Sequence, residues 1–329
     1  MKVLVTGGAG FIGHNVVREL EQQGHQCSIL DSLTGYGIIP EQEIVYLTNH
    51  RLKRVDCEQN IGDIRDPAVN TVFKKFDPDV VIHLANVAND PCSDLNSKLN
   101  WEVNVLATKL LVEKAIDHSV TQFIYASSGS VYGYKQEPQV TEELSLVPLS
   151  DYNKTKMISE RVLLSYADEI LIQIVRPATV CGYSPRMRLD LSVNVLTSQA
   201  YQNQKITVFG GSQTRPNIHI QDMVGVYLHF LNQADSIHGI FNAGFENLSI
   251  MEIAQRASSK IKSDILVSES NDPRSYRLNS DKLLATGFKQ KFTVDNAMDE
   301  LIEAFQNGRL KDEDKYYNIR TMKELPDLF

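Results

Sequence analysis

Residues 1–20 read MKVLVTGGAGFIGHNVVREL, a short apolar run followed by four glycines and then a helical pattern. The run Lys2–Thr6 has the composition of a buried strand, and Gly13–Gln23 carries apolar side chains at helical spacing. Glycines inside an element cost backbone entropy, so this cluster needs a physical reason. Gly7 can adopt a turn conformation that other residues avoid, Gly10 lets a ligand approach the backbone, and Gly13 lets the helix pack tightly on the strand.

The start of the predicted helix is suited to a pyrophosphate. Gly10, Phe11, Ile12 and Gly13 lie where a helix N-terminus offers unpaired N–H groups and a partial positive charge. Asp31 ends the next predicted strand, where a carboxylate can accept both ribose hydroxyls of an adenosine and repels a 2′-phosphate. The turn and this acid together predict that the cofactor is NAD rather than NADP.

A further acid follows a short apolar step in the stretch Gly62-Asp63-Ile64-Arg65-Asp66. Asp63 and Ile64 are candidates for contact with the adenine edge of the cofactor. The alternative for Asp63 is a solvated loop carboxylate, and the sequence leaves both open.

The composition limits the classes of protein to which this chain can belong. The chain has 329 residues with 42% hydrophobic and 22% charged residues, and its net charge of −8 argues against a nucleic-acid or anionic-membrane partner. Histidines lack metal-ligand spacing, and no apolar stretch is long enough to span a membrane. We expect a cytoplasmic protein without a metal, in which the cysteines are free thiols. These are Cys27, Cys57, Cys92 and Cys181.

Strand-like and helix-like segments alternate over the first half of the chain. Expected strands are Lys2–Thr6, Gln26–Asp31, Val80–Leu84, Gln122–Ser127 and Ile170–Arg176, and expected helices are Gly13–Gln23, Trp101–His118 and Tyr152–Tyr166. Such alternation predicts an α/β fold with a doubly wound parallel sheet (Rossmann) and a smaller C-terminal α/β substrate lobe. We place the NAD-binding domain at residues 1–177 with a return at about 216–240, and the smaller substrate lobe at 178–215 and 241–329.

Two polar segments carry the predicted chemistry. Tyr152 and Lys156 are four residues apart, hence on one face of a helix, and Ser128 follows a predicted strand. An ammonium near the phenol lowers its pKa and favours the phenolate, and a positively charged nicotinamide acts in the same direction. Tyr152 is therefore the candidate general base for a sugar hydroxyl, and Ser128 can hydrogen-bond the same oxygen.

The chain resembles the extended short-chain dehydrogenase/reductases, in particular the nucleotide-sugar epimerases and dehydratases, because its motifs follow in the order typical of that family. The matching stretches are TGGAGFIG at 6–13, Asp31, HLAN at 83–86, NVLATKLL at 104–111, SSGSVYG at 127–133, YNKTK at 152–156 and RPATVCG at 176–182. The resemblance implies bound NAD, a Ser128–Tyr152–Lys156 active site and a nucleoside-diphosphate sugar as substrate.

The resemblance also implies roles for further residues. Leu84, Ala85, Pro177 and Thr179 would lie beside the cofactor, and Lys156 would hold the nicotinamide ribose. A homodimer would form through the helices near residues 101–118 and 152–166. Residues that match family contacts to the substrate diphosphate are Asn194, Arg215 and Arg274.

The two residues after Ser128 narrow the choice among the reactions that this family catalyses. The 4,6-dehydratases of the family carry an acidic pair there, whereas this chain has Gly129 and Ser130, which counts against dehydration. Oxidation at C4 by NAD remains, followed either by return of the hydride to the other face (a 4-epimerase, which we favour) or by reoxidation of NADH elsewhere (a C4 dehydrogenase or oxidase). A non-catalytic NAD-binding sensor is the rival from another class.

Polar residues after the third and fifth expected strands are candidates for the substrate side. Asn86 begins a loop that would overhang the sugar, and it either selects a hydroxyl pattern or only makes loop hydrogen bonds. Arg186 and Arg188 can bind the sugar or the diphosphate, with a loop salt bridge as the alternative. Nothing in the sequence distinguishes UDP, GDP, CDP or dTDP.

Overall fold

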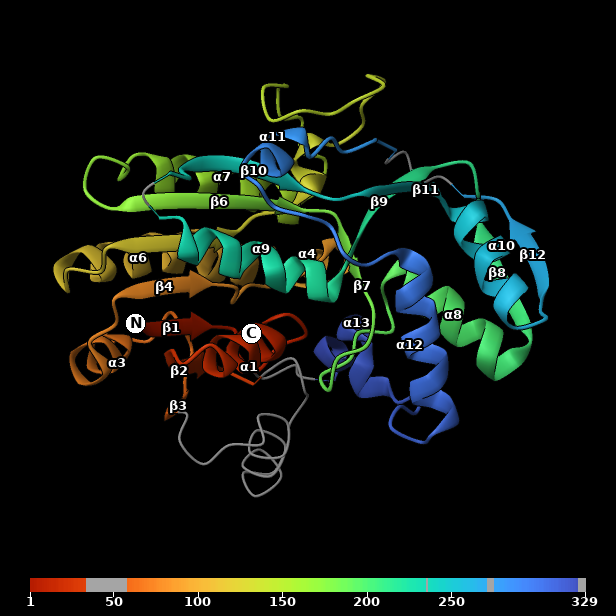
Figure 1. The fold of residues 1–329 in the computed structure, drawn as a ribbon, viewed down its shortest axis with the longest axis horizontal. Coiled ribbons are helices and arrows are strands. Elements are labelled where there is room, and N and C mark those ends of the chain that lie inside the picture. Colours follow the sequence, from red (N-terminus) through yellow and green to blue (C-terminus); the bar gives the residue numbers. More distant parts are fainter. Residues whose placement is uncertain (34–57, 235, 271–274, 325–329) are drawn as a thin grey trace.

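The computed structural model describes residues 1–33, 58–234, 236–270 and 275–324. A seven-stranded parallel sheet forms the larger part of the molecule, in the order β10-β6-β5-β4-β1-β2-β3 (Figure 1). Its strands are β1 (Lys2–Thr6), β2 (Gln26–Asp31), β3 (Glu58–Ile61), β4 (Val80–His83), β5 (Gln122–Ala126), β6 (Leu171–Pro177) and β10 (Gly239–Ala243). This is the predicted doubly wound sheet, and its strand order reverses beside β1, where such sheets bind ligands.

Helices cover both faces of this sheet. On one face α1 (Gly13–Gln22) packs against α9 (Ile220–Asn232), and on the other α6 (Thr108–Asp117) packs against α3 (Val69–Phe76) and α7 (Asp151–Leu164). Two apolar cores result, one on each face of the sheet. The strands are buried on both sides, which explains why their sequences are almost continuously apolar.

The expected helix at 101–118 is divided in the structure. It consists of α5 (Ser97–Trp101), a π-helical turn η2 (Glu102–Ala107) and α6. The sequence does not predict the π-helical turn, which is a common feature near functional sites. The remaining elements of the larger lobe are α4 (Asp90–Leu95) and the 3₁₀ turn η3 (Gly129–Tyr132).

The chain crosses between the two lobes more than once. After β7 (Thr179–Cys181) it builds the smaller lobe, then it returns through β9 (Thr214–His219) to α9 and adds β10 to the edge of the large sheet. The segment that belongs to the large sheet extends to Ala243, and the sequence analysis placed this return at about 216–240.

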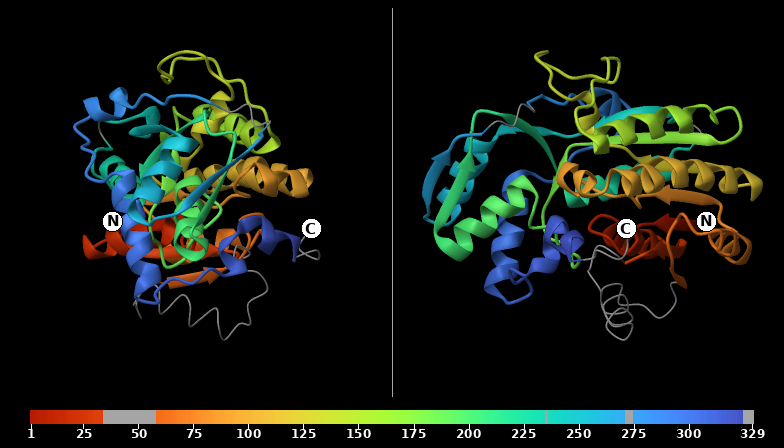
Figure 2. Two further views of the ribbon diagram at one scale, coloured as in Figure 1. Left: turned by 90° about the vertical axis from the view of Figure 1, so that its right-hand side faces the viewer. Right: turned by 180° about the vertical axis from the view of Figure 1, so that it is seen from behind.

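The smaller lobe packs helices against short strands (Figure 2). Its elements are α8 (Ser192–Asn203), β8 (Lys205–Phe209), β11 (Glu246–Ser249), α10 (Ile250–Lys260), β12 (Asp264–Ser268), α12 (Val294–Gln306), η4 (Asp314–Tyr316) and α13 (Asn318–Lys323), whereas α11 (Asp281–Ala285) packs beside β10 of the large sheet. No helix in the described ranges is both long and apolar enough to cross a membrane.

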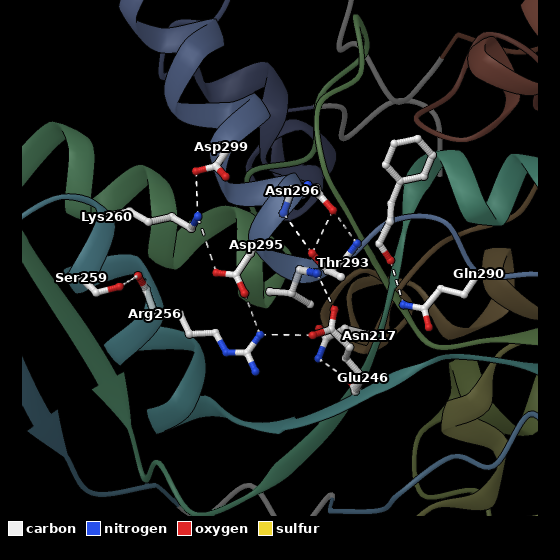
Figure 3. A network of polar contacts seen from close by, with 12 residues as sticks. Asn217, Glu246, Arg256, Ser259, Lys260, Gln290, Thr293, Asp295, Asn296 and Asp299 are labelled. Carbon is white, nitrogen blue, oxygen red and sulfur yellow. Dashed lines mark hydrogen bonds and ion pairs between the residues drawn. The ribbon is translucent and has the colours of Figure 1, made fainter.

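Charged side chains tie α12 to the rest of the smaller lobe (Figure 3). Arg256 of α10 contacts Glu246 at 3.1 Å and Asp295 at 3.0 Å, and Lys260 contacts Asp299 at 2.7 Å. These pairs are partly exposed, so each contributes less than about 1 kcal/mol. The apolar core beneath them therefore supplies most of the stability of this lobe.

Candidate active site

A cavity of about 530 Å³ lies at the carboxyl ends of the large sheet's strands and extends to the smaller lobe. Side chains from the turn after β1 and from the ends of β2, β4, β5 and β6 line it. The structure thus brings together at one cavity most of the residues that the sequence analysis selected. These are Gly7, Gly10, Phe11, Ile12, Gly13, Asp31, Asp63, Ile64, Leu84, Ala85, Asn86, Ser128, Tyr152, Pro177, Thr179, Arg186, Arg188 and Arg215.

The glycine turn closes one side of the cavity. Gly7 has φ +70°, and a Cβ there would lie 2.7 Å from the backbone nitrogen of Ala85. A Cβ at Gly13 would lie 2.1 Å from the carbonyl oxygen of Gly7, so only glycine lets α1 start against the turn. A Cβ at Gly10 would meet that same oxygen at 3.1 Å and otherwise project into the cavity. The turn therefore has the shape that a pyrophosphate needs.

The acids at the ends of β2 and β3 lie at the same cavity. Asp31 accepts hydrogen bonds from the backbone N–H groups of Ala9 (3.0 Å) and Leu33 (2.8 Å), which fix its carboxylate beside the glycine turn. Asp63 is half-buried and pairs with Arg65, whose Nη2 lies 2.9 Å from its Oδ2. Arg65 also contacts Glu102 at 2.8 Å and lines the cavity, a contribution that the sequence analysis missed.

Helix α7 carries the predicted tyrosine and lysine on one face. Ser150 caps the helix by accepting a hydrogen bond from the Asn153 N–H at 3.2 Å. The Lys156 ammonium is buried, donates to the carbonyl oxygen of Ala126 at 2.7 Å, and lies 5.9 Å from the centre of the Tyr152 ring. Lys156 does not itself line the cavity but lies behind Tyr152.

The electrostatics of this pair differ from the sequence-based expectation. Burial, together with the negative charge of Asp90, raises the pKa of Tyr152 to about 12, although its hydrogen bond to Ser128 and the charge of Arg188 oppose the shift. Burial also lowers the pKa of Lys156 to about 7, against the opposing charge of Glu160. The protein's own groups therefore raise the Tyr152 pKa, whereas the sequence analysis expected it to be lowered, because desolvation is the largest contribution.

Ser128 stands at the end of β5 with a second serine. Its Oγ lies 2.7 Å from the Ser130 Oγ and accepts a hydrogen bond from the Ser130 N–H at 3.2 Å. The Ser130 hydroxyl in turn donates to the Asn153 side chain on α7. A Cβ at Gly129 would lie 3.1 Å from the carbonyl oxygen of Pro177 and 3.3 Å from the Tyr276 hydroxyl, so a carboxylate side chain has little room there.

Below the catalytic residues lies a group that we call the buried support cluster: Ser127, Tyr132, Glu160, Arg176 and Asn242. Arg176 donates to both carboxylate oxygens of Glu160, at 2.9 and 2.6 Å, and to the Tyr132 hydroxyl at 2.7 Å. Tyr132 donates to Asn242 at 2.8 Å, and Ser127 donates to Glu160. The two charged side chains are only 3% and 2% exposed. Glu160 follows Lys156 by four residues, as Lys156 follows Tyr152, so the three share one face of α7. The sequence analysis did not use this spacing to select Glu160.

Asn104 on the π-helical turn connects the cavity loop to α7. Its Oδ1 accepts from the Val87 N–H at 2.8 Å, and its Nδ2 donates to the Val87 carbonyl at 3.1 Å and to Thr155 at 3.3 Å. It therefore fixes the loop after β4 relative to the helix that carries Tyr152.

The substrate side differs in part from the expectation. Arg188 lines the cavity but makes two 2.9 Å bonds to Asp190, which is the loop salt bridge held as the alternative. Asn194 is buried outside the cavity lining, where it bonds the Gly182 N–H (3.1 Å) and the Arg188 carbonyl (2.9 Å). Its amide is bonded to backbone groups, so Asn194 supports the loop of residues 184–190, which we call the arginine loop. Arg274 lies outside the described residues.

Asn86 presents an acceptor to the cavity. Its Nδ2 donates to the Leu84 carbonyl at 2.7 Å, while its Oδ1 is buried and has no partner among the described residues. A ligand donor would satisfy this oxygen, since buried polar atoms are rarely left unpaired. Within the described ranges, no cluster of histidine, cysteine or acidic side chains could hold a metal ion.

Comparison with known proteins agrees with this geometry. The model of the NAD dependent epimerase/dehydratase family matches residues 3–244. The chain belongs to this family. It is 32% identical over 259 residues to an uncharacterized UDP-glucose epimerase of Bacillus subtilis, covering 77% of this chain and 80% of that protein. It is 27% identical to the dTDP-D-glucose 4,6-dehydratase of Mus musculus, covering 93% and 89%.

Among solved structures, the UDP-glucuronic acid 4-epimerase from Bacillus cereus, in complex with UDP-glucuronic acid and NAD, superposes with a TM-score of 0.81. It is 25% identical, and the match covers 93% of this chain and 99% of that one. The cofactor of this NAD-dependent enzyme family fits the glycine turn and Asp31 described above. The chain is thus an NAD-dependent enzyme of the nucleotide-sugar epimerase/dehydratase type.

Proposed function

We propose that the protein is an NAD-dependent nucleotide-sugar 4-epimerase, which oxidises the sugar at C4 and reduces it again from the opposite face. The observation that carries the proposal is the site around Tyr152. Ser128, Tyr152 and the ammonium of Lys156 gather there, while Gly129 and Ser130 occupy the two positions that are acidic in the dehydratases. Elimination of water needs an additional acid–base pair, and the Gly129 backbone leaves little room for one.

NAD supplies a hydride acceptor at C4 and, when bound, a positive charge near Tyr152. Glycines 7, 10 and 13 and Asp31 would hold its pyrophosphate and adenosine ribose, and Leu84, Ala85, Pro177 and Thr179 would contact the nicotinamide half. The Lys156 ammonium donates to the Ala126 carbonyl. To bind the nicotinamide ribose it would either give up this hydrogen bond or donate to both groups at once.

Tyr152 removes the proton of the C4 hydroxyl as the C4–H bond is broken. The Ser128 hydroxyl donates a hydrogen bond to the same oxygen and stabilises the charge that develops on it. Because burial raises the pKa of Tyr152 to about 12, its phenolate depends on the positive charge that bound NAD would add and on the Lys156 ammonium behind it. After it has taken the C4 hydroxyl proton, Tyr152 returns that proton to the sugar oxygen in the second half of the reaction. Arg186 and Arg215 line the cavity on the side of the smaller lobe, where their charges suit a diphosphate.

Proton NMR of a nucleotide-sugar panel tests the proposal. Purified protein with its bound NAD is incubated with UDP-, GDP-, CDP- and dTDP-linked hexoses. UDP-glucose is tried first because two relatives are named UDP-glucose epimerases. A C4 epimer that grows to equilibrium without added NAD is the expected result. A 4-keto signal no larger than the enzyme concentration would contradict epimerisation and favour the C4 dehydrogenase. A 4-keto-6-deoxy product would identify a dehydratase.

We further propose that the protein forms a homodimer through α5–α6 and α7. Several large apolar side chains are exposed along these helices, with Leu106 and Leu110 at least half-exposed. The others are Trp101 and Leu164. Burying them against a second copy would remove an apolar patch from water. Light scattering after size exclusion is expected to give twice the chain mass, and L106E/L110E to give the monomer mass. A wild-type monomer would contradict this proposal.

A further inference from the structure

A chain of polar side chains leads from the cavity into the protein behind Ser128. Ser128 and Ser130 line the cavity, and Asn153 of α7, which is 0% exposed, lies behind them. The Ser128 and Ser130 Oγ atoms are 2.7 Å apart, and the Ser130 hydroxyl donates to the Asn153 Oδ1. We call these three residues the hydroxyl chain. No step of the proposed mechanism uses its two inner members.

The number of hydroxyl protons fixes the direction of the hydroxyl chain in this structure. An amide oxygen only accepts, so the single hydroxyl proton of Ser130 is directed to Asn153. The Ser130 oxygen must then accept from Ser128, and the only hydroxyl proton of Ser128 points away from the cavity. The Ser128 Oγ also accepts from the Ser130 N–H at 3.2 Å. In this state Ser128 offers the substrate an acceptor and not a donor.

The proposed reaction needs the opposite direction at its midpoint. While the C4 group of the sugar is a hydroxyl, it can donate to an acceptor such as the Ser128 Oγ. Once it becomes a keto oxygen it only accepts, and stabilising the charge on it requires a donor. If Ser128 alone turned its proton toward the sugar, Ser130 would lose the hydrogen bond that it accepts. Reversal of the whole hydroxyl chain avoids this loss.

The Asn153 side chain can reverse the hydroxyl chain. Its Nδ2 is buried and has no partner among the described residues, an arrangement that is rare for a buried polar atom. Rotation of the amide by half a turn exchanges Nδ2 and Oδ1. Asn153 then donates to Ser130, Ser130 donates to Ser128, and the Ser128 proton is directed to the cavity. Each orientation makes one bond to Ser130, so the reversal costs no side-chain hydrogen bond.

We propose that Ser130 and Asn153 are positioning residues that set the direction of the Ser128 hydroxyl, which accepts from the C4 hydroxyl and donates to the C4 keto oxygen. This inference rests on the proposed function, which supplies the oxidation at C4. The hydroxyl hydrogens rotate and no O–H bond breaks, because the amide at the inner end neither takes up nor releases a proton. Tyr152 remains the base, and the hydroxyl chain determines how well Ser128 assists it.

Steady-state kinetics test the inference on the full chain with bound NAD, using the substrate found by NMR. Ser128→Ala is expected to lower kcat about 100-fold, as loss of an oxyanion donor does. Ser130→Ala is expected to lower kcat about tenfold with KM unchanged, because the chain acts on charge that develops during the reaction. The double variant is expected to equal Ser128→Ala alone, since Ser130 acts through Ser128.

Two further variants serve as controls for Ser130→Ala. Ser130→Thr keeps the hydroxyl and is expected to restore most of kcat. Ser165→Ala removes a serine hydroxyl from the exposed end of α7, where it bonds only the Val162 carbonyl at 2.7 Å, and is expected to react as the wild type does. Additive losses in the double variant of Ser128 and Ser130 would show that Ser130 acts on the substrate directly and would overturn the inference.

Asn153→Asp separates positioning from a purely structural role. An ionised carboxylate has nearly the shape of the amide but only accepts, so it holds the Ser128 proton away from the cavity. We expect it to lower kcat at least as much as Asn153→Ala does. In the Ser130→Ala background it is expected to have no further effect, whereas simple charge repulsion at Tyr152 would persist there.

Calorimetric titration with UDP and the thermal midpoint show whether each variant keeps its site and fold. If Asn153→Asp does not fold, the double variant of Ser128 and Ser130 decides alone. Wild-type kcat in Asn153→Asp would overturn the inference and leave the proposed function intact. A wild-type protein that forms no C4 epimer from any nucleotide sugar would overturn both.

Discussion

The buried support cluster and the loop that carries Arg188 and Asp190 both hold an arginine against a carboxylate, but in different surroundings. Arg176 and Glu160 are 3% and 2% exposed and lie under the catalytic residues, whereas Arg188 and Asp190 are 13% and 12% exposed and face the cavity. The first pair is enclosed by elements of one sheet and its helices. The second pair joins three segments from different parts of the chain.

Because of this difference, one pair contributes mainly to the stability of the protein and the other mainly to ligand binding. A charge pair removed from water has its partners fixed by the fold, so damage to it falls mainly on the stability of the protein. A pair at a cavity edge keeps contact with water and ligand, so damage to it falls mainly on binding. Tyr152 lies between the two regions, with Glu160 two turns further along α7 and the charge of Arg188 acting on its phenol.

The largest effect is expected from Tyr152→Phe. Loss of the general base is expected to lower kcat by about 10²–10⁴-fold, because positioned proton transfer contributes on that order. The thermal midpoint is expected to change little, since the hydroxyl alone is removed. Steady-state rates on the substrate found by NMR, with melting curves of both proteins, provide the measurement. A variant with full activity would contradict the catalytic assignment.

Arg176→Met is expected to cost about 3–5 kcal/mol of unfolding free energy, because it leaves the Glu160 carboxylate buried and unpaired. Urea denaturation measures this loss. Adding Glu160→Gln to the variant is expected to restore part of it, since the uncompensated charge is then gone. If the single variant were as stable as the wild type, the contrast between the two regions would be lost.

Lys156 makes stability depend on pH. Its pKa of about 7 in the folded protein lies below the usual 10.5, so between these values the unfolded chain binds more protons. Stability is therefore expected to rise with pH across this window, by at most about 1.4 kcal/mol per pH unit from this group. Urea titrations between about pH 7 and about pH 9.5 measure the slope, and Lys156→Met is expected to flatten it. An equal slope in both proteins would show that Lys156 is charged in the folded state.

The smallest effect is expected from Met322→Ala on α13. The side chain is half-buried at the cavity edge, so its loss is expected to cost about 1 kcal/mol of stability or less. KM for the nucleotide sugar is expected to rise a few-fold while kcat stays unchanged, because the residue touches no reacting atom. A change in kcat alone, measured by the same steady-state assay, would place Met322 nearer the chemistry than its position at the cavity edge implies.

Residue patterns within one turn or helix were sufficient to predict that the glycine turn, Ser128 and Tyr152 gather at one cavity. The glycines follow a strand, and Tyr152 and Lys156 share a helical face, so backbone geometry alone brings them near the strand ends. The pKa of Tyr152 was predicted in the wrong direction. Its value depends on how much water the whole site excludes and on Asp90, which comes from another element.

The substrate side was less predictable from the sequence. Asn194 matched a motif but uses its amide on backbone groups, and Asn318, in a segment left without a role, lines the cavity instead. Both outcomes depend on how the arginine loop packs between the lobes. The position of β10 at the edge of the large sheet likewise results from a return of the chain that local periodicity does not encode.

By itself the sequence determined the doubly wound fold, the cofactor and the order of the Ser128, Tyr152 and Lys156 motifs. These depend on short-range geometry: strand and helix periods, glycine conformations and a spacing of four residues. Only the tertiary structure decided which charges are paired, which polar residues line the cavity and that residues of α13 are among them. Those properties depend on burial and on contacts between distant segments, and Arg186 and Asn318 meet only when the chain is folded.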